Sequence, residues 1–372
     1  MKIGIITLNG YYNYGNRLQN YALSQSLLKL ATNIQVDNIW YGGEGSLLGK
    51  KFKTASFLRK YFLNRHGFRS YINDRKYSLD CIREYNMKKF TDKYIPTVFV
   101  DNADLELVGS QYDYFVTGSD QIWNPHWIEG KIEFLTFASK EKRIAYAASF
   151  GVSEVSGKKE ASFSQYLKDM NYISVRENAG AQIVKKLSGR DVPVVLDPTM
   201  LLSRDEWCGI AERPGWYKDE KYILVYFLND LPEAVRKSIE MVAEKENLKI
   251  INVLDKENFD FYTSSPEEFL FLLEHASLVF TDSFHGTVFS IIMGIPFVNF
   301  GRKAGSMDMN SRIDTLLALV ELENRRAVEG GKLPDNLFET DYSVAWEKIE
   351  KEKVKAQEFL RQALNLAGDC ND

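Results

Sequence analysis

His285 is one of four histidines in the chain, and its position suits acid–base chemistry. It follows the apolar run Leu278–Thr281, which predicts a strand, and residues 287–293 predict the next helix, so His285 and Gly286 occupy the turn between them. An imidazole with a reference pKa near ~6.5 exchanges protons at neutral pH. His285 is therefore a candidate general acid or base, and a helix-capping or buried structural histidine is the alternative.

Arg176 lies in a comparable position in the first half of the chain. The run Tyr172–Val175 predicts a strand, and the segment after Glu177 has the apolar spacing of a helix. At the carboxyl edge of a sheet, a guanidinium can bind a carboxylate or a phosphate through two parallel hydrogen bonds. We therefore expect Arg176 to bind an anion, with a surface ion pair to Glu177 as the alternative.

The segment from Gly10 to Arg17 joins the first predicted strand, residues 3–8, to the first predicted helix, residues 16–30. Gly10 and Gly15 have the spacing of a P-loop, but Asn16-Arg17 replaces the Lys-Ser/Thr pair, so a magnesium-bound nucleoside triphosphate is not supported. Backbone N–H groups, amides and a guanidinium at a helix N-terminus suit an anion or sugar hydroxyls. The alternative is a glycine turn followed by a helix cap at Asn16.

A further polar cluster leaves the predicted strand at 112–116 through Gly118. It consists of Ser119, Asp120 and Gln121, and it is followed by Trp123 and Trp127. Aromatic rings beside amides and carboxylates suit sugars, whose apolar C–H face stacks while the hydroxyls form hydrogen bonds. The alternative is that Asp120 caps a turn and Trp123 belongs to the core.

The cysteines and apolar runs exclude several classes of protein. Cys81, Cys208 and Cys370 have no C-x-x-C pairing, and no His, Asp or Glu cluster has metal-ligand spacing, so we expect neither a disulfide framework nor a metal site. Residues 3–8 are too short for the core of a signal peptide, and residues 288–300 are too short to span a bilayer. These features predict a cytoplasmic protein.

The elements that carry these residues alternate between strands and helices. Further strands are predicted at 144–148, 192–196, 222–227, 249–254 and 296–300. Such alternation predicts an α/β fold with parallel sheets. We place an N-terminal Rossmann-like domain at 1–196, a second at 197–345, and a helix at 346–372 that packs back on the first domain.

The chain of 372 residues is balanced in charge except in one segment. Its 47 Lys and Arg against 51 Asp and Glu give a net charge of -4, which excludes a general nucleic-acid binder. Residues 50–76 contain nine Lys or Arg and one acidic residue, Asp74, a local charge of +8, with interleaved aromatics. This basic insertion predicts peripheral contact with anionic lipid at the inner membrane face or with an acidic glycan, and a solvated helical insertion is the alternative.

Five motifs, in order, resemble the polysaccharide pyruvyl transferase family over residues 1–325. They are Tyr12-Asn-Tyr-Gly-Asn-Arg17, Thr117-Gly-Ser-Asp-Gln-Ile-Trp123, Ser174-Val-Arg-Glu177, Leu196-Asp-Pro198 and Thr281-Asp-Ser-Phe-His-Gly286. The resemblance implies two Rossmann-like domains facing a cleft, similar to the GT-B glycosyltransferases. It also implies a role in polysaccharide and exopolysaccharide biosynthesis, in which pyruvate is moved from phosphoenolpyruvate to a glycan or lipid-linked oligosaccharide as a ketal. No metal or redox cofactor is needed for this reaction.

The resemblance also implies roles for individual residues. His285 matches the family's catalytic histidine and Arg176 a donor-binding arginine. We expect the substrates to be bound by Asn13, Gly15, Asn16, Arg17, Gly118, Ser119, Asp120, Gln121, Trp123, Ser283, Gly286, Thr287 and Arg312. Many members carry arginine where this chain has Ser283, so phosphoenolpyruvate is expected as the donor only if Arg17, Arg302, Lys303 or Arg312 replaces that charge.

Two other functions fit the same sequence. One is a glycosyltransferase of the same architecture that uses a sugar nucleotide, because a fold does not determine a function. The other is a glycan-binding protein that kept the fold and lost the donor site, which Ser283 favours.

Overall fold

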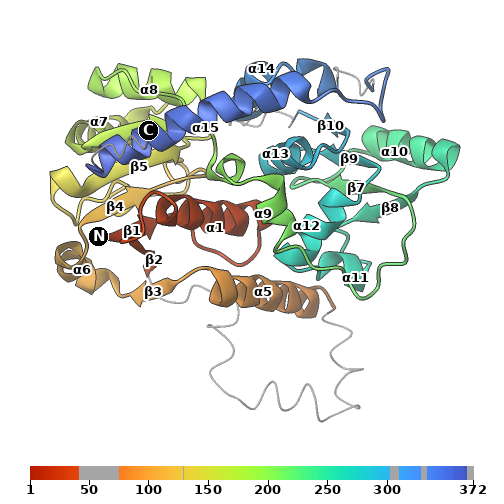
Figure 1. Ribbon diagram of the computed structural model, residues 1–372, viewed down its shortest axis with the longest axis horizontal. Coiled ribbons are helices and arrows are strands. Elements are labelled where there is room, and N and C mark those ends of the chain that lie inside the picture. Colours follow the sequence, from red (N-terminus) through yellow and green to blue (C-terminus); the bar gives the residue numbers. More distant parts are fainter. Residues whose placement is uncertain (42–74, 129, 302–309, 328–332, 367–372) are drawn as a thin grey trace, which may run out of the picture.

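The computed structural model describes residues 1–41, 75–128, 130–301, 310–327 and 333–366 (Figure 1). The basic insertion predicted at 50–76 lies outside the described residues, apart from Arg75 and Lys76, which begin helix α5 (Arg75–Tyr94). Arg302 and Lys303 also lie outside them. In the described part of the chain, no helix has both the length and the apolar character needed to cross a membrane.

The N-terminal half contains a six-stranded parallel sheet in the order β3-β2-β1-β4-β5-β6. Its strands are β1 (Lys2–Ile6), β2 (Gln35–Tyr41), β3 (Thr97–Val100), β4 (Tyr114–Thr117), β5 (Arg143–Ala148) and β6 (Tyr172–Val175). This is the strand order of the Rossmann fold, and its direction reverses between β1 and β4. Ligands of open α/β sheets bind beyond the carboxyl ends of the strands at such a reversal.

The C-terminal half contains a four-stranded parallel sheet in the order β10-β9-β7-β8. Its strands are β7 (Tyr222–Tyr226), β8 (Lys249–Asn252), β9 (Leu278–Thr281) and β10 (Phe297–Asn299). The order reverses between β7 and β9. The apolar runs of β7 and β9 are buried throughout, as expected for strands covered on both faces. The two sheets confirm the predicted α/β class with two Rossmann-like halves.

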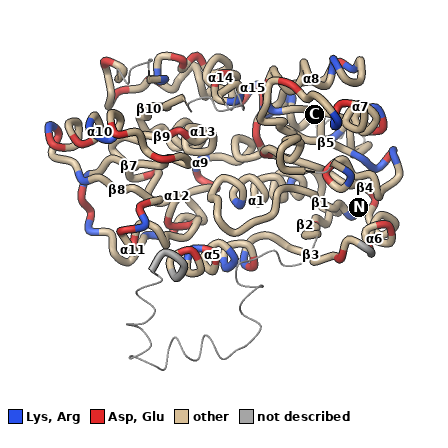
Figure 2. Tube along the Cα trace, turned by 180° about the vertical axis from the view of Figure 1, so that it is seen from behind, with Lys and Arg blue, Asp and Glu red and all other residues tan. Residues whose placement is uncertain are grey.

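Helices cover the two sheets, which lie side by side in Figure 1. Helices α1 (Tyr14–Leu28), α5, α6 (Leu105–Gln111), α7 (Glu160–Asp169) and α8 (Asn178–Ser188) belong to the first half. The second half holds α9 (Arg204–Cys208), α10 (Glu233–Glu246), α11 (Phe259–Tyr262), α12 (Pro266–Glu274), α13 (Phe284–Met293) and α14 (Ser311–Leu319). Short 3-10 turns are η1 (Asn102–Asp104), η2 (Lys140–Lys142), η3 (Gly157–Lys159), η4 (Pro198–Leu201) and η5 (Glu323–Arg325). On the face shown in Figure 2, Lys and Arg are interspersed with Asp and Glu along outer helices such as α10 and α5.

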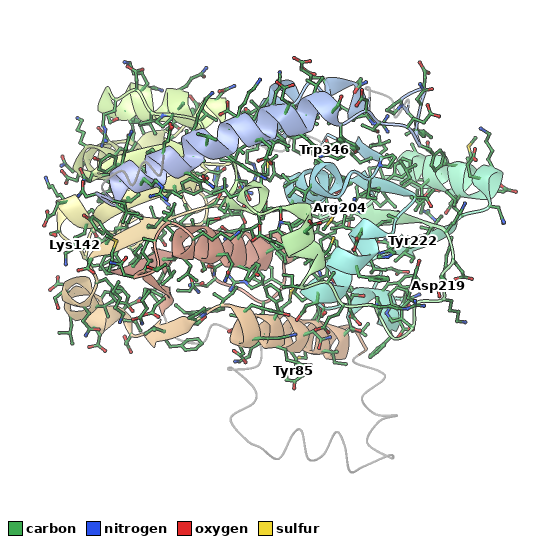
Figure 3. The ribbon with its side chains drawn as sticks, in the orientation of Figure 1. Tyr85, Lys142, Arg204, Asp219, Tyr222 and Trp346 are labelled. Atoms are coloured by element: carbon green, nitrogen blue, oxygen red, sulfur yellow. The ribbon has the colours of Figure 1, made fainter. Side chains whose placement is uncertain are left out.

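The last helix, α15 (Ser343–Ala363), joins the two halves. In Figure 1 it runs from the C-terminal half across to the N-terminal half. Near its start, Trp346 faces α13 (Figure 3), and its indole N–H donates to the carbonyl of Ile291 at 2.9 Å. Near its end, the ring of Phe359 lies 6.3 Å from the rings of both Tyr146 and Tyr172. Helix α15 therefore packs on both halves of the molecule.

A buried arginine joins the halves on the opposite side. Arg83, on α5, donates to the hydroxyl of Tyr14 at 2.9 Å and to the carbonyl of Tyr262 at 2.7 Å. Tyr14 in turn donates to the carbonyl of Ser264 at 2.7 Å. One hydrophobic cluster also runs without interruption from Ile3 and Ile5 in β1 into the second half. The two halves therefore share a core and behave as one packed body.

Several boundaries differ from those predicted. Helix α1 begins at Tyr14 rather than Asn16, because the Asn13 side chain accepts a hydrogen bond from the Asn16 backbone and forms the cap. Helix α13 begins at Phe284, so His285 and Gly286 lie in its first turn. The strands β2 and β3 were not predicted. Residues 192–196 form a single bridge to β6 instead of a strand, and Pro193 lacks the N–H that a continued ladder needs.

Candidate active site

The two sheet reversals face a common cavity of about 570 Å³. Most of its lining comes from the segments that follow β1, β4, β7 and β9, which are the four strands that flank the reversals, and Arg312 comes from α14. From the first half come Leu8, Asn9, Tyr12, Asn13, Asn16, Asp120, Gln121 and Trp127; from the second come Leu228, Asn229, Ser283, Phe284, His285 and Arg312. This cavity between the halves is the candidate active site.

Two helices begin at the cavity. Asn13 caps α1, and its Oδ1 accepts from the Asn16 N–H at 3.2 Å. Ser283 caps α13, and its Oγ accepts from the Gly286 N–H at 3.3 Å. Both capping residues line the cavity. Helix N-termini carry a partial positive charge, so both helices favour a negatively charged group at this place.

His285 is held between the two halves. It belongs to α13, yet the Gly15 backbone of α1 lies so close that a β-carbon there would stand 2.8 Å from the His285 Cβ and overlap the ring. The opposite ring nitrogen, Nε2, lies 3.6 Å from Oδ2 of Asp197. That separation exceeds a hydrogen bond but allows an ion pair when the imidazole is protonated. His285 is 5% exposed and reaches the cavity.

Asp197 is the buried anchor of the site. Its Oδ2 accepts from Nη1 of Arg176 at 2.6 Å and from the Ser119 hydroxyl at 3.1 Å, and its Oδ1 accepts from the N–H and hydroxyl of Thr199. Burial acts against ionisation, but His285 and Arg176 together hold the pKa of the Asp197 carboxyl well below its usual range. Asp197 is therefore a buried carboxylate that pairs directly with Arg176.

Asp120 connects this anchor to the cavity. Its Oδ1 lies 3.2 Å from Nη2 of Arg176 and 3.8 Å from Nη1 of Arg312. Burial acts to raise the pKa of Asp120, but Arg176, His285 and Arg312 lower it overall. The Gln121 amide adjoins Arg312, and with its oxygen toward the guanidinium it accepts from both terminal nitrogens, at 3.0 and 3.1 Å. These contacts orient Arg312 at the cavity wall.

Arg176 lies behind the cavity wall rather than in it. Its guanidinium packs 4.3 Å from the ring centroid of Phe284 and pairs with two carboxylates. It lines a separate cavity of about 340 Å³, together with Asp197, Thr315 and Glu352. Phe284 lines both cavities and separates them. Two carboxylates already neutralise Arg176, so its position suits holding Asp197 and Asp120 in place.

The predicted site residues divide into two groups. Those that line the main cavity are Asn13, Asn16, Asp120, Gln121, Ser283, His285 and Arg312. Those that lie outside its lining are Gly15, Arg17, Arg176, Gly118, Ser119, Trp123, Gly286 and Thr287. The second group consists mainly of buried residues that support the first.

Arg17 and Trp123 show what this support consists of. Arg17 is fully buried; it donates to Oδ1 of Asn16 at 2.7 Å and to the carbonyl of Leu8 at 3.0 Å, and burial lowers its pKa to about 10. It fixes the loop after β1 from inside. Trp123 stacks on Phe134 with ring centroids 4.6 Å apart, so it belongs to the core.

The glycines and hydroxyls of the second group act through close packing. A β-carbon on Gly118 would stand 3.1 Å from the carbonyl carbon of Tyr146, and one on Gly286 would stand 3.1 Å from the Cβ of Thr281. The hydroxyl of Thr287 donates to the carbonyl of Ser283 at 3.1 Å. These contacts set the position of the loops after β4 and β9.

Some residues of the site were not singled out from the sequence. Asp197 appeared only within a motif, although an aspartate before Pro198 at a domain boundary was a usable signal. Tyr12 and Asn229 line the cavity as well, and so does Trp127, which the sequence had already marked as a sugar-stacking candidate. Asn229 follows β7, and its place beyond a strand end in the second half was the signal for it. Among the described residues, no group of three or more His, Cys, Asp or Glu is arranged to hold a metal ion.

Comparison with known proteins identifies a family for this chain. Residues 13–303 match the family model described as Polysaccharide pyruvyl transferase. No curated protein sequence matches the chain.

Solved structures that match this chain cover nearly all of it. A putative UDP-N-acetylglucosamine 2-epimerase from Listeria monocytogenes is 11% identical, with a TM-score of 0.48 over 99% of this chain and 92% of that one. The S. aureus MnaA–UDP complex is 13% identical, with a TM-score of 0.48 over 96% and 90%. E. coli ADP-heptose LPS heptosyltransferase II is 10% identical, with a TM-score of 0.35 over 95% and 99%. At these low scores, the fold is defined by the chain's own two sheets.

Proposed function

The chain belongs to the polysaccharide pyruvyl transferase family, and from that premise we propose that it moves a pyruvyl group from phosphoenolpyruvate to two hydroxyls of a glycan sugar. The observation that carries the proposal is that His285 and Arg312 reach one cavity at which two helices begin. A proton donor and a site for anions are what this reaction requires.

The proposed reaction has three steps. A proton adds to the methylene carbon of phosphoenolpyruvate, and positive charge develops at C2. A first sugar hydroxyl adds to C2 and gives up its proton. A second hydroxyl then displaces the phosphate from C2, its proton leaves with the phosphate, and the ketal closes. The protein must therefore donate one proton, accept one, and stabilise an anionic donor.

His285 is the proposed acid for the first step. The Asp197 carboxylate lies 3.6 Å from Nε2 and faces the imidazole that donates the proton. After donation, the neutral imidazole accepts the proton that the first hydroxyl releases. His285 returns to its starting state in this way, and no other base is required.

Arg312 is the proposed partner of the donor's anionic groups. It lines the same cavity as Ser283, the position at which many family members carry arginine. The two capped helix N-termini add further positive potential. Arg176, which two carboxylates neutralise, acts instead as a positioning residue. Arg312 on α14 therefore supplies the positive charge that many family members carry at the position of Ser283.

The test is release of phosphate from phosphoenolpyruvate in the presence of acceptor oligosaccharides. Arg312→Gln should raise the dissociation constant for phosphoenolpyruvate by roughly 10- to 100-fold, the loss expected for one charge-assisted contact. The matched control is Arg213→Gln, which removes an exposed ion pair with Asp219 and should change nothing.

Two results would contradict the proposal. One is a wild-type protein that neither binds phosphoenolpyruvate nor releases phosphate with any acceptor. The other is equal affinity for phosphoenolpyruvate in Arg312→Gln and wild type. Binding of a sugar nucleotide in the same cavity, seen by saturation-transfer NMR, would favour a glycosyltransferase instead.

A further inference from the structure

Two exposed aromatic side chains stand at the rim of the cavity. Tyr12 is 73% exposed and Trp127 is 51% exposed, and both line the cavity. His285 and Arg312, at 5% and 4%, lie at its floor. Exposed apolar groups that cluster at a pocket commonly mark a ligand-binding site. The rim therefore differs in chemistry from the floor, where charged groups dominate.

The structure fixes the ring of Tyr12 and the turn that carries Trp127. A β-carbon on Gly10 would stand 2.9 Å from Cζ of Tyr12, so the tyrosine ring lies directly against the Gly10 backbone. The backbone N–H of Trp127 donates to the carbonyl of Asn124 at 3.1 Å, and Lys159 donates to the carbonyl of Pro125 at 2.7 Å in the same turn. A segment that is ordered before a ligand arrives loses little entropy on binding.

Amide groups accompany the rings. Asn9 and Asn13 from the first half and Asn229 from the second line the same cavity. In the described residues, neither amide atom of Asn9 has a hydrogen-bond partner, although both are buried. The N–H of Asn229 is held by the Asp282 carboxylate, which fixes its loop. The unpaired amide of Asn9 beside two aromatic rings offers a donor, an acceptor and an apolar face together.

We propose that Tyr12 and Trp127 bind the acceptor glycan by stacking on the apolar C–H faces of its pyranose rings, while the Asn9 amide hydrogen-bonds to hydroxyls. The inference rests on the proposed function and deepens it, since it assigns the acceptor to the rim and the donor to the floor. A neutral sugar ring has both an apolar face and a belt of hydroxyls, and the rim provides a partner for each. In this arrangement the acceptor hydroxyls enter from the rim toward His285.

Ring removal tests this assignment. Tyr12→Ala and Trp127→Ala should each raise the KM for the acceptor by roughly three- to tenfold, the value of one aromatic contact. The dissociation constant for phosphoenolpyruvate, and kcat at saturating acceptor, should stay at wild-type values. Tyr12→Phe and Trp127→Phe, which keep a ring, should restore most of the affinity. Tyr85→Ala is the matched control, because Tyr85 is 52% exposed on α5, away from the cavity (Figure 3).

A second readout does not depend on turnover. Saturation-transfer NMR with acceptor oligosaccharides should show contact through the C–H protons of one sugar face in the wild type, and loss of that signal in Trp127→Ala. If the protein transfers no pyruvyl group but binds glycans through these two rings, the proposed function is overturned and the rim assignment stands. Unchanged glycan binding in both alanine variants would overturn the rim assignment. The rim assignment would also be overturned if the alanine variants lost as much affinity for phosphoenolpyruvate as for the acceptor. Binding of a nucleotide base that depends on these two rings would overturn it as well.

Discussion

The backbone of Gly15 lies against the imidazole of His285, so that a β-carbon at position 15 would overlap the ring and stand 2.8 Å from the histidine Cβ. Gly15 belongs to the first turn of α1, and His285 to the first turn of α13. The N-terminal half therefore sets the position of the proposed acid, which the C-terminal half carries. Any side chain at position 15 must displace it.

Gly15→Ala should lower turnover by about 10²-fold, the cost of moving a catalytic group by roughly 1 Å. Alanine favours a helix more than glycine does, so a loss cannot come from helix propensity. Initial rates of phosphate release measure the effect. Gly215→Ala is the control, because a β-carbon there meets no atom within 4 Å. Equal rates in both variants would show that His285 is not held by this contact.

His285→Gln should lower kcat by the ~10²–10⁴ that lost acid–base catalysis typically costs. The amide occupies similar space and still forms hydrogen bonds, so the melting temperature and the affinity for phosphoenolpyruvate should change little. His275→Gln is the matched control, because His275 is exposed and lines neither cavity. A lower melting temperature with normal rates per folded molecule would instead assign His285 a structural role.

Asp197→Asn should destabilise the protein by about 3–5 kcal/mol at neutral pH, because it leaves the buried Arg176 without its closest carboxylate. Urea unfolding measures this difference. The folded-state pKa of Asp197 lies below the unfolded value of about 3.9, so its stabilisation is complete above pH 4 and is lost as pH falls toward the folded pKa. The difference in unfolding free energy between wild type and Asp197→Asn should therefore be constant from pH 8 to 5 and become smaller below pH 4.

The control for Asp197 is Asp219→Asn, which removes an exposed pair with Arg213 and should leave stability unchanged. A deficit that grows on acidification would contradict the assignment of Asp197 as an ionised anchor. So would an Asn variant as stable as the wild type at pH 7.

Cys208 should react slowly with alkylating reagents. Burial, with a hydrogen bond to Glu274 and the charge of that carboxylate, raises the pKa of the thiol to about 11. Because the thiolate is the nucleophile, labelling by iodoacetamide at pH 8 should be on the order of 10²-fold slower than for free cysteine and should rise with pH. Mass spectrometry of the Cys208 peptide measures the rate. Glu274→Gln should speed it, Glu240→Gln should not, and a fast pH-independent reaction would refute the assignment.

The positions of Arg176 and His285 could be predicted because each directly follows, or lies close after, a short apolar strand, and parallel strands bring their carboxyl ends to one edge. The start of α13 was placed three residues late, because the capping hydrogen bond of Ser283 is not visible in apolar spacing. The strand β2 was missed for a related reason: its buried Asp37 and Asn38 interrupt the apolar run.

The separation of binding from supporting residues could not be read from the sequence. Trp123 and Trp127 are four residues apart, but one stacks on Phe134 in the core and the other stands at the rim. Arg176 has the chemistry of an anion binder, but it pairs with Asp197, which lies beyond the intervening helix α8. Such choices depend on tertiary packing, which brings together residues with no fixed spacing along the chain.

The position of helix α15 has a consequence for co-translational folding. It is the last described helix of the chain, yet Phe359 packs beside Tyr146 and Tyr172, and the Asn365 amide donates to the Tyr114 hydroxyl at 2.8 Å. During synthesis, the first sheet emerges from the ribosome long before this covering exists. The entire C-terminal half must be translated before α15 is synthesised. Until then, the part of the N-terminal half that α15 covers is exposed to solvent. Its exposure to chaperones and proteases is therefore set by the translation time of the second half.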